Sequence, residues 1–336
     1  MLKNMPLVYA LAGVLAFAVS VYFTPIIRTA ALKFGILDKP DGRLKKQQDA
    51  VPYLGGLAVY LGFLVALAFT FSFEEKVMGV LLGATLVLVL GLLDDLGRLS
   101  PHVKLGFQLL AALVLVKSGI RIELVFLPEW VELPLSVLWI LLVTNALNII
   151  DIMDGLATGV AAIACMALFC VSIINGRPAV AVMAISLAGS LAGFIKFNFA
   201  PARIYLGDTG SLFVGSVLAS LTLIGSYTIK NTVSLLAPVV ILGVPLFDTA
   251  FVSYIRWRRG MPVFLGSPDH FALRLRKWRL TVAQTVLCSY AACAVLAACA
   301  IWMMYLPDLG AVAVIVGLGF LGLGIGAFLR KIDMSM

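Results

Sequence analysis

Eleven long apolar segments are the feature that most constrains how this chain can fold. A helix needs about 20 mostly apolar residues to cross the hydrocarbon layer of a membrane. The whole chain is 62% hydrophobic and only 12% charged, whereas about a quarter of a soluble domain is charged. These values exclude a soluble enzyme and a disordered chain, and they predict an all-α, polytopic membrane helix bundle with about eleven transmembrane helices in one domain, 1–336. The segments lie near 5–23, 53–73, 77–93, 104–119, 135–150, 156–174, 178–197, 210–229, 233–254, 282–304 and 309–328.

Lys and Arg are distributed unequally between the two sides that these segments define. Nineteen of the 25 fall in 24–52, 94–104, 196–209, 255–281 and the C-terminal tail. Because basic loops stay in the cytoplasm, we expect these loops to be cytoplasmic and the N-terminus to be outside. All five Glu fall outside, whereas eleven of the twelve Asp fall at or near the cytoplasmic side. Short carboxylates beside a basic surface indicate a cytoplasmic site for a metal and a polyanion. Charge confined to short loops at a bilayer argues against nucleic acid as a partner.

Asp94 and Asp95 end the third apolar segment. The helix dipole disfavours negative charge at a helix C-terminus, and adjacent carboxylates also repel each other. We therefore expect a cation nearby, which is Arg98, Lys104 or a bound metal. Adjacent helical residues point about 100° apart, so one Asp is expected to face the site while the other supports it. A solvated helix end with a local Arg partner is the alternative.

Four polar residues, Asn145, Asn148, Asp151 and Asp154, interrupt the fifth and sixth apolar segments at three-residue spacing. In an α-helix each would trail the previous one by about 60°, so that the four wind around one side. Polar groups this near lipid are costly, and they indicate a functional site. Asp154, which precedes Gly155, would alternatively cap the following helix.

The stretch that joins the seventh and eighth segments holds Asp208 between Gly207 and Gly210. Glycines let the backbone approach a ligand, and the following helix is expected to turn its N-terminus to the cytoplasm, which suits a phosphate. Asn198 and Tyr205 lie nearby in the sequence. The alternative for Asp208 alone is a simple helix N-cap.

The last cytoplasmic loop, 255–281, carries seven basic residues and one acid, Asp269, followed by His270. Positive-inside charge and attraction to anionic lipids explain part of this charge. Two classes of function fit the chain: an enzyme for a phosphorylated, nucleotide-bearing substrate, and an ion-coupled transporter. Transporter sites tend to lie near the membrane midplane between repeated halves, whereas these motifs cluster at one face and no repeat is visible. The enzyme is therefore favoured.

Together these stretches resemble the polyprenyl-phosphate N-acetylhexosamine-1-phosphate transferases (glycosyltransferase family 4), in particular the undecaprenyl-phosphate GlcNAc-1-phosphate transferases. The matching motifs are Asp94-Asp95, the ladder from Asn145 to Gly155, Asn198 with Gly207-Asp208-Thr209-Gly210-Ser211, and Pro245-Leu-Phe-Asp248-Thr249. The resemblance implies a multi-pass enzyme of the bacterial inner membrane, with its active site on the cytoplasmic face, that transfers GlcNAc 1-phosphate from UDP-GlcNAc to undecaprenyl phosphate and releases UMP. The product would start a cell-envelope polysaccharide such as lipopolysaccharide, and a homodimer is left open. The phospho-MurNAc-pentapeptide transferases are the alternative branch, although the first loop lacks their long Thr-rich stretch.

The resemblance also implies roles for individual residues. Mg²⁺, for which Mn²⁺ can substitute, would be bound by Asp208 and Asn148. The other expectations form three groups: catalytic Asp94, Asp95, Asp208 and His270; a nucleotide-sugar pocket of Asn145, Asn148, Asp151, Asp154, Gly155, Leu156, Asn198 and Tyr205; and phosphate-binding Lys104, Arg274, Arg276 and Lys45. Two departures from the family pattern are visible. The His-rich signature of the last loop is reduced to Asp269-His270, and the first loop has Lys45-Lys46-Gln47 where many relatives have Lys-x-His.

Overall fold

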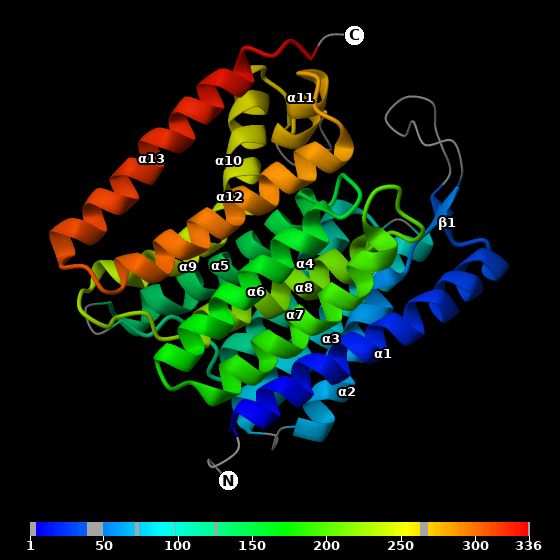
Figure 1. Cartoon of the computed structure of the whole chain (residues 1–336), viewed down its shortest axis with the longest axis horizontal. Helices are drawn as coiled ribbons and strands as arrows, with labels where there is room; N and C mark the ends of the chain where they lie inside the picture. Colours follow the sequence, from blue (N-terminus) through cyan, green and yellow to red (C-terminus); the bar gives the residue numbers. More distant parts are fainter. Residues whose placement is uncertain are drawn as a thin grey trace.

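The computed structural model describes residues 5–38, 50–70, 74–97, 99–124, 127–262 and 268–334, and these are almost entirely helical (Figure 1). The elements are α1 (Met5–Phe34), β1 (Leu37–Asp38), β2 (Val51–Pro52), α2 (Gly55–Thr70), α3 (Glu75–Gly97), α4 (Pro101–Lys117), α5 (Glu129–Ile149), α6 (Leu156–Ile174), α7 (Pro178–Asn198), α8 (Gly207–Ile224), η2 (Val233–Leu236), α9 (Ala237–Ile241), α10 (Gly243–Arg258), α11 (Phe271–Lys277), α12 (Val282–Met303) and α13 (Asp308–Arg330). The two short strands pair antiparallel, with Leu37 opposite Pro52.

Eight of the described helices are long and apolar enough to cross a membrane. A ninth span results if Val233–Ile241 and α10 count as one, although they meet at an angle of 77°. All eleven expected segments contain a helix, but α2 has only 16 residues and α4 only 17. At about 1.5 Å per residue, both are shorter than the hydrocarbon layer is thick. The structure therefore supports a multi-pass helix bundle. Its helices are long enough for eight or nine spans, which is fewer than the eleven expected.

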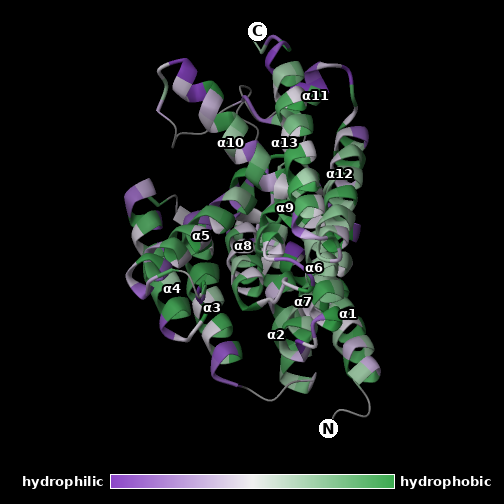
Figure 2. Ribbon diagram, turned by 90° about the vertical axis from the view of Figure 1, so that its left-hand side faces the viewer, coloured by the Kyte–Doolittle hydropathy of each residue, from purple (hydrophilic) through white to green (hydrophobic). Residues whose placement is uncertain are grey.

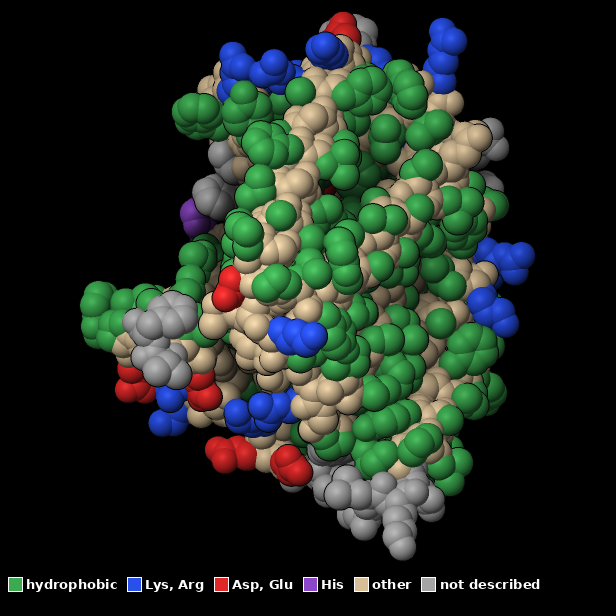
Figure 3. Space-filling view, turned by 60° about the vertical axis from the view of Figure 1, so that its left-hand side comes forward, with side chains coloured by type: hydrophobic (Ala, Val, Ile, Leu, Met, Phe, Trp, Pro, Cys, Tyr) green, Lys and Arg blue, Asp and Glu red, His purple; other side chains and the backbone are tan. Residues whose placement is uncertain are grey.

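The helix α8 lies in the middle of the bundle in two views at right angles (Figures 1 and 2), and α13 lies along one edge in Figure 1. Most of α8 is buried between α3, α5 and α2. In α13, by contrast, only 6% of the apolar stretch is buried inside the protein. Hydrophobic side chains cover the middle of the outer surface, and charged ones gather toward its ends (Figure 3). This is the surface of a protein whose solvent is lipid over its middle and water at both ends.

Glycines allow α2, α3 and α8 to touch backbone to backbone. A Cβ added to Gly56 of α2 would lie less than 3.0 Å from the backbone of Gly210, and one added to Gly91 of α3 would lie as close to the backbone of Asp208. Close approach through small residues is the usual way in which membrane helices associate. Because Gly91 is one turn before the Asp94-Asp95 pair, this packing brings the pair to the start of α8.

Candidate active site

Lys104 joins the two acidic motifs where α3, α4 and α8 meet. Its Nζ lies 2.9 Å from Asp94 Oδ2 and also forms an ion pair with Asp208 Oδ2. All three side chains are partly shielded from solvent, with exposed fractions of 19% for Lys104, 14% for Asp94 and 31% for Asp208. The cation expected beside the Asp pair is thus Lys104, while Arg98 lies outside the described residues.

Asp95, unlike Asp94, holds the start of α8. Its Oδ1 accepts the backbone N–H of Asp208 at 3.0 Å, and its Oδ2 accepts both the backbone N–H and the hydroxyl of Thr209, at 3.0 and 2.6 Å. Gly207, at φ +72°, leaves the space that this carboxylate occupies, because a Cβ there would lie 2.6 Å from Asp95 Oδ2. Asp208 is in the first turn of α8 and not at its N-cap, which is Leu206.

The first two residues of the polar ladder, Asn145 and Asn148, are helical and connect α5 to α4 and α8. Asn148 donates through Nδ2 to Asp208 Oδ1 at 2.6 Å and to Ser211 Oγ at 2.9 Å. Asn145 donates to Gln108 Oε1 at 2.7 Å and accepts from its Nε2 at 3.3 Å. Asn148 therefore orients the carboxylate of Asp208, and Asn145 fixes α4 against α5.

The second half of the ladder is not helical, which corrects the expectation of four residues winding along one helix. The helix α5 ends at Ile149, and Gly155 caps α6 at φ +77° without a side-chain hydrogen bond. Asp154 does not cap α6, because its Oδ2 accepts the backbone N–H of Ala202 at 2.9 Å. Burial, followed by the carboxylates of Asp208 and two further Asp, raises the pKa of Asp151 well above its ordinary value. An Asp in this environment gains most from an added cation.

The remaining pocket residues divide into supporting and accessible side chains. Asn198 is buried, accepts the hydroxyl of Thr158 at 2.7 Å and donates to the carbonyl of Ile204 at 3.1 Å. Leu156 is completely buried, so its side chain packs in the core and is not accessible to a ligand. Tyr205 is partly exposed, and burial raises the pKa of its phenol above the ordinary value.

The loop 255–281, which the sequence predicts to be cytoplasmic, forms a second cluster with α10, α11 and α13. His270 Nδ1 lies 2.7 Å from Asp248 Oδ2. Arg274 is 1% exposed, forms an ion pair with Asp269 at 2.6 Å and donates to carbonyls at the end of α13. Its guanidinium is thus used inside the protein, which disagrees with the phosphate-binding role expected from the sequence. Arg276 is exposed, and Lys45 lies outside the described residues.

Two tyrosines contribute to the site although no motif singled them out. The ring of Tyr53 lies 6.1 Å from that of Tyr205, centroid to centroid, at a tilt of 52°. Its signal in the sequence is its place just before Gly55-Gly56. Tyr290 of α12 donates to the carbonyl of Gly155 at 2.5 Å and gives no signal, because it lies within an apolar segment.

Comparison with known proteins agrees with these motifs. A family model described as glycosyl transferase family 4 matches residues 77–226, the segment from the beginning of α3 to just beyond α8. A probable undecaprenyl-phosphate N-acetylglucosaminyl 1-phosphate transferase of Bacillus subtilis is 35% identical over 82% of this chain and 81% of its own length. The chain belongs to glycosyl transferase family 4.

Other relatives come from both branches of this family. An undecaprenyl-phosphate alpha-N-acetylglucosaminyl 1-phosphate transferase of Thermotoga maritima is 30% identical over 78% of this chain and 81% of its own length. A phospho-N-acetylmuramoyl-pentapeptide-transferase of Halalkalibacterium halodurans is also 30% identical, over 81% of this chain and 90% of its own length. These relatives are transferases, so the transporter alternative finds no support.

The acidic cluster of this family 4 protein fits a hard cation that arrives with a phosphate. Among the described residues, no three His, Cys, Asp or Glu side chains form a metal site by themselves. Mg²⁺ commonly binds through one or two carboxylates together with substrate phosphates, so such a cage is not required. Asp208 offers carboxylate oxygens, and Asn148 has an amide oxygen that no hydrogen bond engages in the described part of the chain.

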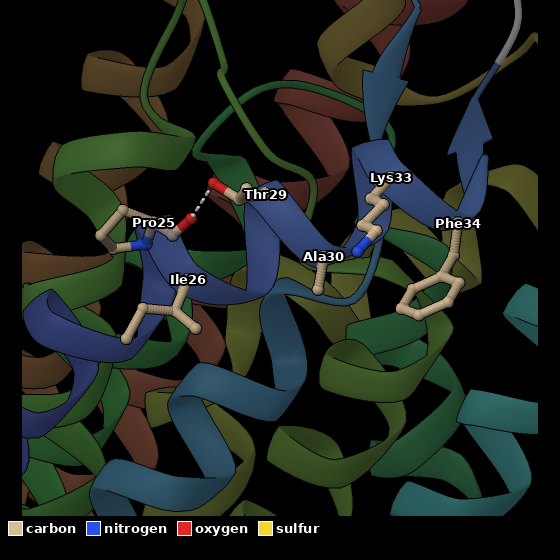
Figure 4. A pocket seen from close by; sticks show the side chains of 6 residues that line it. All are labelled: Pro25, Ile26, Thr29, Ala30, Lys33 and Phe34. Carbon is tan, nitrogen blue, oxygen red and sulfur yellow. Dashed lines mark hydrogen bonds between the residues drawn. The ribbon is translucent and has the colours of Figure 1, made fainter.

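An open hollow lies elsewhere and has different chemistry. It is open, measures about 580 Å³ and is lined by Pro25, Ile26, Thr29, Ala30, Lys33 and Phe34 (Figure 4). All six residues come from the last turns of α1, and none of them is acidic. The carboxylate cluster on α3 and α8 is therefore the better candidate for the active site of this family 4 protein.

Proposed function

We propose that this protein transfers N-acetylglucosamine 1-phosphate from UDP-GlcNAc to undecaprenyl phosphate, giving undecaprenyl-diphospho-N-acetylglucosamine and UMP. The observation that carries the proposal is the ion-paired group of Asp94, Lys104 and Asp208 at the start of α8, within the segment that matches the family. The name of the relative from Bacillus subtilis supports the choice of sugar and acceptor. The reaction would take place at the cytoplasmic face of a bacterial inner membrane and would begin a cell-envelope polysaccharide.

In the proposed reaction, an oxygen of the lipid phosphate attacks the phosphorus that bears the sugar. A new P–O bond forms there, and the bond to the phosphate oxygen of UMP breaks. Lys104 would bind a phosphate oxygen. Its ammonium already contacts two anionic oxygens, one of Asp94 and one of Asp208, and a phosphate oxygen of the substrate would be a third. Asp94, which faces Lys104, is placed to orient or deprotonate the lipid phosphate.

Asp95 would not contact the substrate, because both of its oxygens accept hydrogen bonds from the start of α8. Its role would be to hold that turn in position. The N-terminal turn of α8 then presents its dipole to the diphosphate. When bound by Asp208 and Asn148, Mg²⁺ or Mn²⁺ would neutralise charge on the diphosphate as the new bond forms. Asp151, whose pKa is raised by burial and by neighbouring carboxylates, would be stabilised by the same cation.

The uridine is assigned to the loops beside this cluster. Tyr205 and Tyr53 form a partly exposed aromatic pair, which suits stacking on a uracil ring. Asp154 holds the loop around Ala202, and Asn198 holds the same loop from the other side through the carbonyl of Ile204. Pocket shape therefore depends on two buried or half-buried polar side chains that need not touch the nucleotide.

A second candidate is phospho-MurNAc-pentapeptide transfer, and the relative from Halalkalibacterium halodurans supports it at 30% identity. The two candidates share their acceptor and their leaving group, so only the sugar donor separates them.

The decisive experiment uses purified protein with undecaprenyl phosphate and a panel of UDP-sugars, in Mg²⁺ or in EDTA. Released UMP and an organic-extractable sugar lipid are measured together. Mg²⁺-dependent UMP release with UDP-GlcNAc alone is the expected result. Activity with UDP-MurNAc-pentapeptide alone would replace this donor, and folded protein that releases UMP from no donor would refute the proposal.

A further inference from the structure

Asp248 is a buried acid that the proposed reaction does not use. It lies in α10, is 0% exposed and uses both carboxylate oxygens on one turn of the last cytoplasmic loop. Its Oδ1 accepts the backbone N–H of Phe271 at 2.9 Å, and its Oδ2 lies 2.7 Å from His270 Nδ1. A buried carboxylate is costly unless such partners satisfy it, so the pair of contacts explains how Asp248 is tolerated in α10.

The contact with Asp248 restricts the protonation pattern of the imidazole. An ionised carboxylate accepts hydrogen bonds only, so Nδ1 of His270 must carry a proton. In the neutral ring, Nε2 is then the acceptor, because the two nitrogens have opposite roles. His270 is 6% exposed, and in the described part of the chain its Nε2 is neither hydrogen-bonded nor among the buried atoms that lack a partner. That nitrogen is thus the part of the ring that remains available to a ligand.

The turn that carries His270 is held firmly on its other side. Asp269 is 1% exposed and pairs with Arg274 at 2.6 Å and with Arg259 at 3.0 Å. Arg274 also donates to the carbonyls of Leu329 and Ile332 at 3.1 and 2.8 Å. The ion pair and these two backbone contacts together link the turn to the end of α13.

We propose that Asp248 is a positioning residue that holds His270 with Nδ1 protonated, so that Nε2 accepts a hydrogen bond from the bound substrate. The inference rests on the proposed function for the identity of that substrate, but the proton pattern of the ring does not depend on it. A carboxylate behind a histidine acts in this way in other enzymes, where it fixes the tautomer and the orientation of the ring.

The tautomer can be measured directly, because the chain contains only two histidines. Protein labelled with ¹⁵N-histidine, carrying His102→Gln, gives a single imidazole in the NMR spectrum. His102 is exposed on α4, so this background is expected to keep full activity. The neutral ring of His270 is expected to carry its proton on Nδ1.

Asp248→Asn is expected to invert this pattern. The amide has one acceptor oxygen for two donors, and the backbone N–H of Phe271 cannot give up its proton, whereas the imidazole can. The oxygen therefore goes to Phe271, the amide N–H₂ faces Nδ1, and the proton of the ring moves to Nε2. An unchanged tautomer in this variant, or a wild-type ring protonated on Nε2, would overturn the proposal.

His270→Asn separates positioning from simple structural support, even if Asp248→Asn does not fold. The asparagine amide can replace Nδ1 in the contact with Asp248 but offers nothing at the place of Nε2. We expect wild-type thermal stability with kcat/KM lowered about tenfold, the value of one neutral hydrogen bond. Full activity would mean that His270 only supports the fold. If the NMR result holds while UDP-GlcNAc releases no UMP even with wild-type protein, the proposed function fails and the role of Asp248 on the ring stands.

Discussion

Asp94 and Asp95 are neighbours in α3, yet their carboxylates have different partners. Asp94 accepts the backbone N–H of Leu99 at 2.6 Å and pairs with Lys104, and 14% of its side chain stays exposed. The carboxylate of Asp95 accepts three hydrogen bonds from the start of α8. A change of the same kind at the two positions should therefore affect different properties of the protein.

Asp95→Asn should reduce stability, and Asp94→Asn should reduce activity alone. The amide at position 95 keeps one acceptor oxygen for three donors, so the free energy of unfolding should fall by about 2 kcal/mol. Asp94→Asn leaves Lys104 paired with Asp208, so its unfolding should stay close to that of the wild type. Thermal unfolding in detergent and UMP release, measured for both variants, check the two expectations. Equal loss of stability at both positions would contradict this division of roles.

Asp208→Asn should strongly reduce transfer while the protein remains folded. The substitution removes the charge that Lys104 and Asn148 both contact, and with it the carboxylate proposed to bind Mg²⁺. UMP release should fall about 10²- to 10³-fold, the usual loss when a stabilising group for the transition state is removed. Asp308→Asn is a matched control, because Asp308 pairs with Thr232 at the start of α13. Retained activity in Asp208→Asn would disprove the metal assignment.

At the scale of the element, the apolar segments predicted nearly every helix, because length and hydropathy suffice for that. They did not predict the 77° break before α10, since apolar residues continue through it. The spacing of the ladder predicted clustering of its polar groups, but not the end of α5 at Ile149, where the chain leaves the helix before Asp151. The phosphate-binding role that the resemblance implied for Arg274 does not fit its burial, because a sequence does not show which guanidinium is enclosed by carbonyls of a distant helix.

Gly91→Ala should separate α3 from α8 and so reduce activity. The added Cβ would lie less than 3.0 Å from the backbone of Asp208, which cannot move aside as a flexible side chain can. Gly97→Ala, in the same helix, meets nothing within 4 Å and is the control. Away from clashes, Gly→Ala in a helix is favourable by about 0.5–1 kcal/mol. We expect lower activity and a lower unfolding temperature for Gly91→Ala only, and parallel behaviour of the two variants would contradict the close packing.

At the scale of the whole molecule, the candidate site depends on elements that are far apart in the sequence. The central helix α8 brings Asp208 to the ends of α3, α4 and α5, and the two asparagines of α5 fix this junction. The cluster formed there contains more carboxylates than cations among the described residues, with Lys104 between two of them. A site of this charge is poorly suited to a diphosphate alone and well suited to a diphosphate that carries a divalent cation.

Mg²⁺ and UDP-GlcNAc should therefore bind cooperatively. Since the described residues contain no group of three acidic or imidazole ligands, Mg²⁺ alone should raise the unfolding temperature only slightly. UDP-GlcNAc in EDTA should also have little effect, because the carboxylates repel its phosphates. Together they should raise it by more than the sum of the two shifts, since each ligand increases the affinity for the other by the same factor. Thermal unfolding under the four conditions tests this expectation, and Asp208→Asn should lose the cooperative part. Strong stabilisation by Mg²⁺ alone would instead show that the protein binds the metal without substrate phosphates.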